Sequence, residues 1–555
     1  MAETAEHDQQ TQDEQVELVF EPPGPGSWTV DKGHFPYPYT KFHADVMPGA
    51  LWEGFRETFA GYGIPAEGMR AQFVNGFSYG QVVPVDPAEL GARAAAAEEA
   101  LATRRWRLDL QRWDDEAKPA AIARHRELAE VDVDAIVTTE LIRHLRDCHD
   151  HTVAMIVQHH RFNGAAMIPL GDLLASVLEW TGGSVAAPEV MALLAGASPI
   201  SRGECPERRA VLDAIAADTR ATTLLDDDAA DPAELLDALR SEQQVDPPTA
   251  EAVHDWLTLV GHRILDGFDV NQPRAIERPA VLLSSLRHAR AAAEPPEPDP
   301  SAVRDRIPPE HRDAFDERLA EARLTYRLRD ERGIYSDATA LGIMRRAMLA
   351  AGSRLASIGL LASSELAVDA SVDELVALLD DHPAAPTSEE LRARARFRLT
   401  HGIDEIPPVL GDPPSPPPPI ELFPPAMART TRALLATSAS MKAPDEQADD
   451  HRKLHGVAAS PGRHAGTARI VHSIDDLERV GDGDVIVTIT TTEAFNLAMA
   501  CAAAVVTDHG GLLGHAAITA REFGIPAVVG TQRATSMIAE GTLVTVDGTN
   551  GEVSW

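Results

Sequence analysis

The chain has 555 residues, enough for two to four domains, and 86 acidic against 50 basic residues give it a formal net charge of −36. This excess of acid repels phosphate backbones and acidic lipid headgroups, which argues against broad contact with nucleic acid or membrane. Three cysteines are too few for a disulfide framework or a cysteine-rich zinc site, and no apolar stretch is long enough to cross a bilayer. We therefore expect a cytoplasmic protein without a resident metal.

The amino-terminal part of the chain is predicted to be a short leader followed by a long, mainly helical domain. Residues 1–16 are acidic and polar, with neither a basic start nor an apolar core, so a disordered leader is expected rather than a signal peptide. Residues 17–404 form the helical domain. It contains a strand pair over 70–83, where Asn75-Gly76 supplies the turn, and its helices begin at Asp86-Pro87, an N-cap followed by a proline in the first helical position.

One long amphipathic helix of this domain is rich in histidine. His144, Cys148 and His151 share a helical face at a spacing that a metal would accept, but no further ligand motif accompanies them, so ordinary buried or surface histidines are the favoured interpretation. His159 lies on the apolar face of the same helix. It is either a core histidine or a base at the wall of a pocket.

Clustered prolines over 405–450 separate this domain from the rest of the chain. Proline lacks a backbone N–H and cannot sit inside a helix or a central strand, so a semi-rigid extended linker is predicted. A proline-rich ligand for the aromatic groove of a partner is the alternative. Short strands and helices then alternate over 451–555, which indicates a compact layered domain and makes the whole chain a multidomain α+β protein.

A strand–loop–helix unit in the last domain places a histidine at the start of a helix. The apolar run 502–506 predicts a buried strand, a glycine-rich loop follows, a helix opens near His515, and Gly524 stands where a C-terminal cap would. The N–H groups and positive dipole end of a helix start suit the dianion of a phosphorylated imidazole, and neutral imidazole is a competent nucleophile. From spacing alone, a histidine that only makes local hydrogen bonds is the competing interpretation.

Further short motifs occur in order along residues 454–555. They are Gly456–Gly462, Gly466–Arg469, Gly483–Thr488, the loop from Gly510 to His515, Ala520–Glu522 and Val546–Gly548. Together they resemble the swivelling phosphohistidine domain of the PEP-utilizing enzymes, which include phosphoenolpyruvate synthase, pyruvate phosphate dikinase, rifampin phosphotransferase and phenylphosphate synthase. Members of that family commonly carry Ser, Thr or Cys just before the histidine, where this chain has Gly514, which puts the rate of transfer in doubt.

The resemblance implies a β/β/α swivelling domain in which His515 carries a phosphoryl group. Gly510, Gly511 and Gly514 would let the backbone approach the phosphate, although loop glycines also serve any tight turn. Arg521 either neutralises the charge of the phosphate or faces surface neighbours on its helix.

The helical domain must then hold the acceptor. Its segments around His34 and Arg327–Arg332 resemble the helical region of the rifampin phosphotransferase and phenylphosphate synthase relatives. His34 joins His159 as a candidate base for the acceptor hydroxyl. Arg327, Arg329 and Arg332 are either forks that clamp phosphoryl oxygens or a solvated helix face paired with Asp330 and Glu331.

The source of the phosphoryl group is expected outside this chain. The sequence shows no P-loop and no resemblance to an ATP-grasp module, and it ends after the carrier domain, so a separate ATP-grasp subunit with ATP and Mg²⁺ is predicted to charge His515. This division is most similar to the histidine-carrying subunit of phenylphosphate synthase and its cresol-phosphorylating relatives. It implies a hetero-oligomer that converts a small aromatic alcohol, ATP and water into an aryl phosphate, AMP and phosphate. An antibiotic phosphotransferase for a macrocyclic alcohol and a non-enzymatic phosphorelay carrier are the alternatives.

Overall fold

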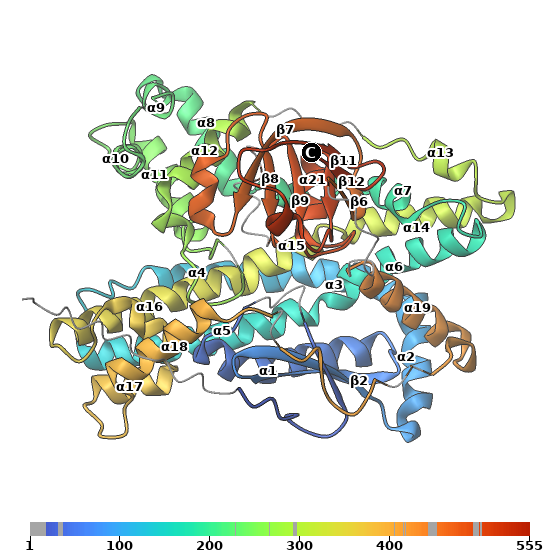
Figure 1. Ribbon diagram of the computed structural model, residues 1–555, viewed down its shortest axis with the longest axis horizontal. Coiled ribbons are helices and arrows are strands. Elements are labelled where there is room, and N and C mark those ends of the chain that lie inside the picture. Colours follow the sequence, from blue (N-terminus) through green and yellow to red (C-terminus); the bar gives the residue numbers. More distant parts are fainter. Residues whose placement is uncertain are drawn as a thin grey trace, which may run out of the picture.

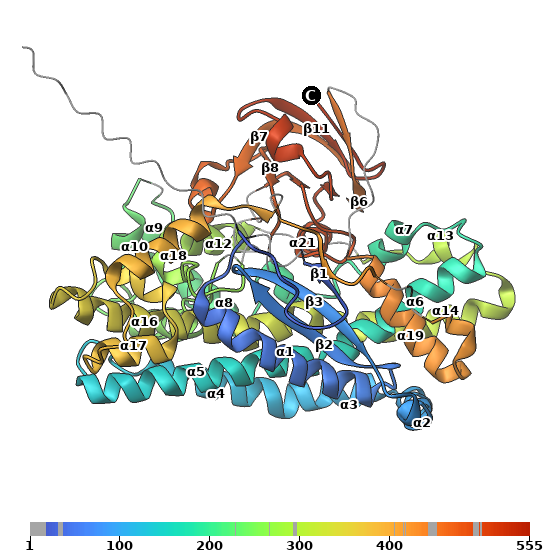
Figure 2. The ribbon, with the colours of Figure 1, turned by 60° about the horizontal axis from the view of Figure 1, so that its bottom comes forward.

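The computed structural model of the chain describes residues 18–31, 37–227, 229–265, 267–291, 297–403, 406–414, 416, 418–441, 452–491, 499 and 502–555. The predicted leader and His34 lie outside these residues. A large, mainly helical part extends to residue 441, and the carboxyl-terminal domain, from residue 452, lies against it (Figures 1 and 2). The predicted fold class, multidomain α+β with a large helical domain followed by a smaller mixed domain, is confirmed.

A four-stranded antiparallel sheet opens the helical part. Its strands lie in the order β2 (Ala66–Val74), β3 (Phe77–Pro84), β1 (Ser27–Val30) and β4 (Val409–Gly411), and α1 (Lys41–Gly61) packs against β2. The predicted hairpin is confirmed, because Asn75 and Gly76 take the left-handed conformation, with φ of 51° and 79°, that a two-residue turn requires.

Helices make up the rest of this part, and the predicted helix start at Asp86-Pro87 is confirmed, since the Asp86 side chain accepts a hydrogen bond from the Ala88 N–H. Leu141, Leu145 and Ile156 are buried along α5, as its apolar face predicted. Among the described residues, none of the helices combines the length and apolarity that crossing a bilayer would require. The helices are α2 Leu90–Ala102, α3 Arg105–Arg112, α4 Lys118–Ala129, α5 Thr138–Arg161, α6 Asn163–Trp180, α7 Ala187–Ala192, α8 Pro206–Ala217, α9 Thr219–Leu225, α10 Pro232–Leu239, α11 Pro247–Leu259, α12 Pro279–Ala291, α13 Ser301–Arg304, α14 Arg312–Thr325, α15 Leu328–Arg332, α16 Thr339–Ser357, α17 Val372–Leu379 and α18 Ser388–Thr400, the π-helices η2 Trp113–Ala117 and η6 Gly333–Ala338, and the 3₁₀ helices η1 Pro87–Glu89, η3 Pro199–Arg202, η4 Ala275–Glu277, η5 Pro309–His311, η7 Ser364–Asp369 and η9 Ile420–Leu422.

The proline-rich segment contains regular structure, so the prediction of an extended linker over 405–450 is wrong for its central part. Besides β4, it holds the 15-residue helix α19 (Pro425–Ala439), which packs along α6. Pro425 stands in the first turn, where a helix does not need the missing N–H, and so it starts the helix rather than breaking it. Gly171 of α6 allows the close approach of the two helices, because a Cβ there would lie 1.9 Å from the Ala433 carbonyl oxygen.

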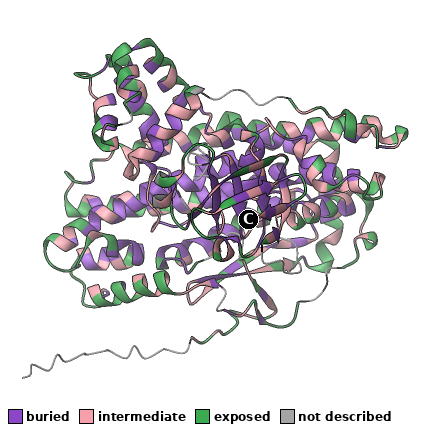
Figure 3. Ribbon diagram, turned by 45° about the horizontal axis from the view of Figure 1, so that its top comes forward, coloured by how far each residue is buried: buried purple, intermediate pink, exposed green. Residues whose placement is uncertain are grey.

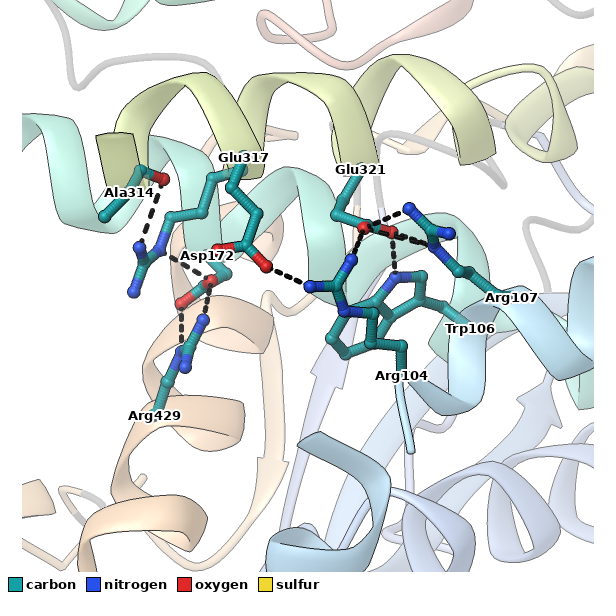
Figure 4. Close-up of polar contacts among 9 residues, drawn as sticks. Arg104, Trp106, Arg107, Asp172, Ala314, Glu317, Glu321 and Arg429 are labelled. Carbon is teal, nitrogen blue, oxygen red and sulfur yellow. Dashed lines mark hydrogen bonds and ion pairs between the residues drawn. The ribbon is translucent and has the colours of Figure 1, made fainter. Parts of the chain in front are cut away.

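Ion pairs also fix α19 to the helical part (Figure 4). Asp172 of α6 is buried and accepts hydrogen bonds from Arg318 of α14 at 2.9 Å and from Arg429 of α19 at 2.8 and 2.6 Å. The neighbouring Glu321 of α14 accepts from Arg104 and from the Trp106 indole, each at 2.7 Å. A cavity of about 400 Å³ lies between the two carboxylates. Because the arginines that line it are already paired with carboxylates, this network is best understood as a brace for α19.

We expect Asp172→Ala to lower the free energy of unfolding by about 1–3 kcal/mol, because two guanidinium groups lose a buried partner. Denaturant unfolding measures this loss. Glu179→Ala is the matched control, since Glu179 pairs with Arg432 across the same two helices with both side chains about half exposed, at 62% and 47%. It should cost less than about 1 kcal/mol. Equal losses in the two variants would contradict the role of Asp172 as the brace.

The carboxyl-terminal domain is built on an eight-stranded sheet with the order β5-β12-β11-β7-β8-β9-β10-β6. Strands β7 to β10 pair in parallel, and β6, β11, β12 and β5 add antiparallel pairings at the two sides. Buried residues gather in the interior of this domain and of the helices beside it, and exposed residues lie mainly on outer helical turns (Figure 3). The elements are β5 Lys453–His455, β6 Val457–Ser460, β7 Arg463–Val471, β8 Val485–Thr488, β9 Ala504–Thr507, β10 Ala527–Val529, β11 Leu543–Asp547, β12 Glu552–Ser554, α21 His515–Phe523, α22 Ala534–Met537 and the 3₁₀ helix η10 Ile474–Arg479.

Candidate functional site

His515 is the first residue of α21, as the sequence predicted. The fully buried strand β9 leads into the glycine-rich loop, Gly514 is the N-cap residue in an extended conformation, and Gly524 ends the helix in the left-handed conformation with φ of 68°. The His515 side chain is 17% exposed. The histidine therefore sits at the positive end of a helix dipole, at the edge of the domain and against the helical part.

The loop before His515 is held from several sides. Leu512 and Leu513 are buried in one apolar cluster with side chains of the helical part, including Leu170 and Tyr326. The Leu513 N–H donates to the Ser440 carbonyl at 3.1 Å, just beyond the end of α19. This packing seats the histidine loop on the helical part of the chain.

Two buried arginines bind the carbonyl groups of this loop. Arg521 of α21 donates to the Leu512 carbonyl at 2.8 Å, and Arg329 of α15 donates to the Leu513 carbonyl at 3.0 Å. Arg521 also donates to the Tyr326 hydroxyl at 3.0 Å and to the Ala459 carbonyl at 2.8 Å. The structure thus places Arg521 in the interface between the two parts, and not among surface neighbours; phosphate binding by Arg521, Gly510, Gly511 and Gly514 stays a prediction.

Asp330 of α15 faces the His515 ring. Its Oδ1 atom lies 3.3 Å from His515 Nδ1, its side chain is fully buried, and its Oδ2 atom accepts a hydrogen bond from the Ser201 hydroxyl of η3. Burial by itself would raise the pKa of the Asp330 carboxyl, but the contacts with His515 and Ser201 and the charge of Arg329 outweigh it and hold the pKa below its ordinary value. Asp330 is therefore a carboxylate at neutral pH, directed at one nitrogen of the histidine.

A second carboxyl group, that of Glu522, is buried beside this pair. Glu522 follows Arg521 on α21 and accepts a hydrogen bond from the Ser198 N–H at 3.1 Å. Burial raises the pKa of the Glu522 carboxyl to about 7, despite the hydrogen bond from Ser198 and the charge of Arg202. His515 thus has one carboxylate in contact and one group nearby whose pKa lies near neutral.

The three predicted phosphate-clamping arginines take different positions. Arg327 pairs with Glu331 at 2.7 Å and Asp114 at 2.5 Å. Arg329 reaches the His515 loop, whereas Arg332 donates to the His159 carbonyl at 3.4 Å. The alternative of a solvated helix face is wrong for Arg329 and Arg332, because α15 is covered and both side chains are buried.

His159 is buried and paired with a carboxyl group. Its Nδ1 atom lies 2.9 Å from Asp337 Oδ1, on the π-helix η6 that directly follows α15. Burial raises the pKa of Asp337 to about 7, against the opposing effects of backbone hydrogen bonds and Arg332. π-Helical turns are frequent at functional sites. Both sequence interpretations of His159, core histidine and base, are compatible with this pair, so its role as a base stays a prediction.

Two further histidines of α5, His144 and His151, are buried and contact neighbouring side chains. His144 contacts Cys148, with Nε2 3.4 Å from Sγ, whereas His151 Nε2 lies 3.0 Å from His125 Nδ1. His125 Nε2 in turn lies 3.0 Å from the Tyr335 carbonyl of η6. In the part of the chain that the structure describes, no group of three or more His, Cys, Asp or Glu side chains is arranged to hold a metal ion.

We expect the His125–His151 pair to make the protein less stable in acid. Burial lowers the pKa of His125 to about 4 and that of His151 to about 3, below the ordinary value of 6.5. Between the folded-state pKa values and the ordinary value of 6.5, the unfolded chain therefore binds more protons than the folded protein. The contribution of the neutral, buried pair to the free energy of unfolding is complete above pH 6.5 and is lost as the pH falls toward 4.

Unfolding free energies at pH 7.5 and 5.5 test this expectation. His125→Gln should reduce the difference between the two pH values relative to the unsubstituted protein. His149→Gln, at a more exposed position of the same helix, is the control and should leave that difference unchanged. An undiminished difference in His125→Gln would contradict the account.

Two family models match this chain, and the contact between His515 and Asp330 lies between the two matched stretches. Residues 480–551 match the PEP-utilising enzyme, mobile domain, and residues 161–350 match the rifampicin phosphotransferase fourth domain. The first stretch contains His515, and the second contains Asp330 and the π-helix η6. The predicted resemblance to PEP-utilizing enzymes is confirmed at this level, whereas the finer resemblance to phenylphosphate synthase stays a prediction.

Curated relatives match parts of this chain. A probable phosphoenolpyruvate synthase of Archaeoglobus fulgidus is 46% identical over 108 residues, which are 20% of this chain and 14% of that protein. The uncharacterized phosphotransferase YvkC of Bacillus subtilis is 38% identical over 110 residues, 20% of this chain and 13% of that protein. The uncharacterized protein Mb2073c of Mycobacterium bovis is 31% identical over 328 residues, 58% of this chain and 33% of that protein. The chain therefore spans a third or less of the length of these relatives.

Sequence reasoning missed three polar residues of this site. Asp330 lies within the predicted arginine run, but it was interpreted only as a partner of those arginines. Asp337 and Ser201 carry no local motif. The available signal for Asp330 is its place in a short run rich in both acids and bases, and only the fold shows which of them meets the histidine.

Proposed function

We propose that this chain carries a phosphoryl group on His515 and donates it to a hydroxyl group held by the helical part, as the histidine-bearing component of an ATP-dependent phosphotransferase. One observation carries the proposal. His515 opens a helix at the edge of a PEP-utilising mobile domain and is seated against a stretch that matches a rifampicin phosphotransferase domain. A carrier histidine positioned at another domain is what transfer to a bound acceptor requires.

The ring geometry favours Nε2 as the nitrogen that accepts the phosphoryl group. Nδ1 faces the Asp330 carboxylate, which favours a proton on Nδ1, and the two ring nitrogens point in different directions. The lone pair then resides on Nε2, the nitrogen that faces away from Asp330. The helix start and the glycine loop favour the negative charge that arrives there.

We propose that a separate ATP-grasp subunit charges His515 in the presence of ATP and Mg²⁺, with AMP and phosphate as the co-products. The carboxyl-terminal domain would leave the position seen here, accept the phosphoryl group at that subunit and return. Residues 442–451, which join the domain to α19, lie outside the described part of the chain. In this scheme the α19 brace keeps the fixed end of the connection in place.

A phenol or cresol is the proposed acceptor, and a rifamycin-type alcohol is the second candidate. The match of residues 161–350 to the rifampicin phosphotransferase fourth domain favours the second candidate, whereas the predicted division into subunits favours the first. In either case the acceptor must lose a proton, and His159 with Asp337 is the buried acid–base pair nearest in sequence to Asp330. A non-enzymatic carrier that donates to a protein is the remaining alternative.

His515→Ala should abolish labelling by a small phosphoryl donor such as potassium phosphoramidate, because no other histidine lies at the start of α21. Intact-protein and peptide mass spectrometry measure the labelling. His472→Ala, at an exposed position of the same domain, is the control and should still be labelled. Phosphorylation of the His515→Ala variant at some other residue with unchanged yield would overturn the proposed carrier role.

The charged protein should then discharge to the correct acceptor. Phenol, p-cresol and a rifamycin are each added to the phosphoramidate-charged protein, and ³¹P NMR follows the loss of the phosphohistidine signal and the appearance of a phosphate ester. An aryl phosphate supports the phenol class, and a rifamycin ester supports the antibiotic class. Stable phosphohistidine with all three compounds would argue against both and favour the carrier alternative.

A further inference from the structure

We infer that Asp330 is a positioning residue of the helical part that activates the phosphorylated His515 for donation only while the carrier domain is docked. The inference rests on the proposed function and deepens it. Its basis is that the histidine and the carboxylate that faces it come from the two different parts of the chain, 3.3 Å apart between Oδ1 and Nδ1.

The Asp330 carboxylate has its own support within the helical part. It lies on α15 within the helical part, it is fully buried, and its second oxygen accepts a hydrogen bond from Ser201. Ser201 is itself 2.6 Å from Ser198, between their hydroxyl oxygens. None of these partners of Asp330 belongs to the carrier domain, so undocking would remove the histidine and leave the carboxylate with its support.

Other charged groups lie around the contact between His515 and Asp330, namely Arg329, Arg202, Arg521 and Glu522. Arg329 lies next to Asp330 on α15 and donates to the Leu513 carbonyl. Arg202 of η3 lies 3.9 Å from Glu522, and Arg521 donates a hydrogen bond to the Leu512 carbonyl. Glu522 is the group among them whose pKa lies near neutral, so any titration measured here must be separated from that of Glu522.

The chemistry of a phosphoramidate explains why Asp330 matters. In the donation step the P–Nε2 bond breaks, its electron pair returns to Nε2, and a bond forms from phosphorus to the acceptor oxygen, whose proton passes to a base of the helical part. With a proton on Nδ1, the leaving group is a neutral imidazole. Without that proton, the leaving group would be an imidazolate, which is a far stronger base and leaves slowly. A carboxylate beside Nδ1 favours the protonated form.

The docked and undocked states would therefore differ in reactivity. An opposite charge at this distance raises the pKa of a partner by about one to three units, which is about a 10- to 1000-fold change in the protonated fraction above that pKa. Against the helical part, phosphohistidine would be protonated and ready to donate at neutral pH. Away from Asp330 it would be less protonated, and the phosphoryl group would survive the transit between sites.

Titration of the charged protein tests the inference without knowledge of the acceptor. The full chain is charged with potassium phosphoramidate, and the ³¹P shift of the phosphohistidine is followed against pH. We expect the midpoint in the folded protein to lie one to three units above the midpoint of the same charged chain in urea. This comparison needs no substitution, so it stands even where a variant fails to fold. Equal midpoints, or a lower one in the folded protein, would overturn the inference.

Asp330→Asn should lower the midpoint toward the value in urea, and at a pH above that midpoint it should slow discharge to p-cresol about 10- to 1000-fold. Asp369→Asn is the matched control, a buried aspartate paired with Arg398 far along the chain, and should change neither quantity. Glu522→Gln identifies any part of the titration that belongs to Glu522. A midpoint in Asp330→Asn equal to that of the unsubstituted protein would overturn the inference and leave the carrier role intact. Failure of phosphoramidate to label His515 at all would overturn the proposed function and the inference with it.

Discussion

The site depends on the hydrogen bonds that two buried arginines donate to successive carbonyl groups of the loop before His515. Arg521 from the carboxyl-terminal domain and Arg329 from the helical part satisfy the carbonyls of Leu512 and Leu513, three and two residues before His515. A loop that carried these groups unpaired into an interface would lose the free energy of their hydration. Because both are satisfied, the loop can be buried, α21 can start where it does, and the His515 ring can face Asp330.

The interface combines the apolar packing of a core with buried charged groups. Leu512, Leu513 and Ile518 share one buried apolar cluster with the helical part, which favours docking. Buried charges oppose it, since burial in this interface costs Arg329 and Asp330 their hydration. A purely apolar contact would lack this opposing contribution. The combination of favourable apolar burial and unfavourable charge burial is consistent with a contact that can be made and broken in each proposed cycle.

The sequence predicts best where short-range rules decide the structure. The Asn75-Gly76 hairpin, the helix that starts at His515 and the Gly524 cap each depend on a few neighbouring residues, and all are confirmed. The prediction of an extended linker is wrong at α19, where tertiary packing decides the structure. This helix is stabilised by α6 and by ion pairs with residues more than 100 positions away. No sequence pattern predicts the strands β5 and β6, which have three and four residues.

The site shows the same division between what is local and what is not. His515 could be found because strand, loop and helix start are contiguous, whereas its partner lies 185 residues earlier on α15, at a place that only the docked fold defines. There, Glu331 is engaged by Arg327, Lys118 and the Trp113 indole. The charge of Arg329 acts on Asp330, whereas Arg332 donates to the His159 carbonyl and its charge acts on Asp337. The charged side chains of α15 are thus divided between the contact with His515 and the His159–Asp337 pair, and this division depends on how the helix packs and not on the order of residues in the run.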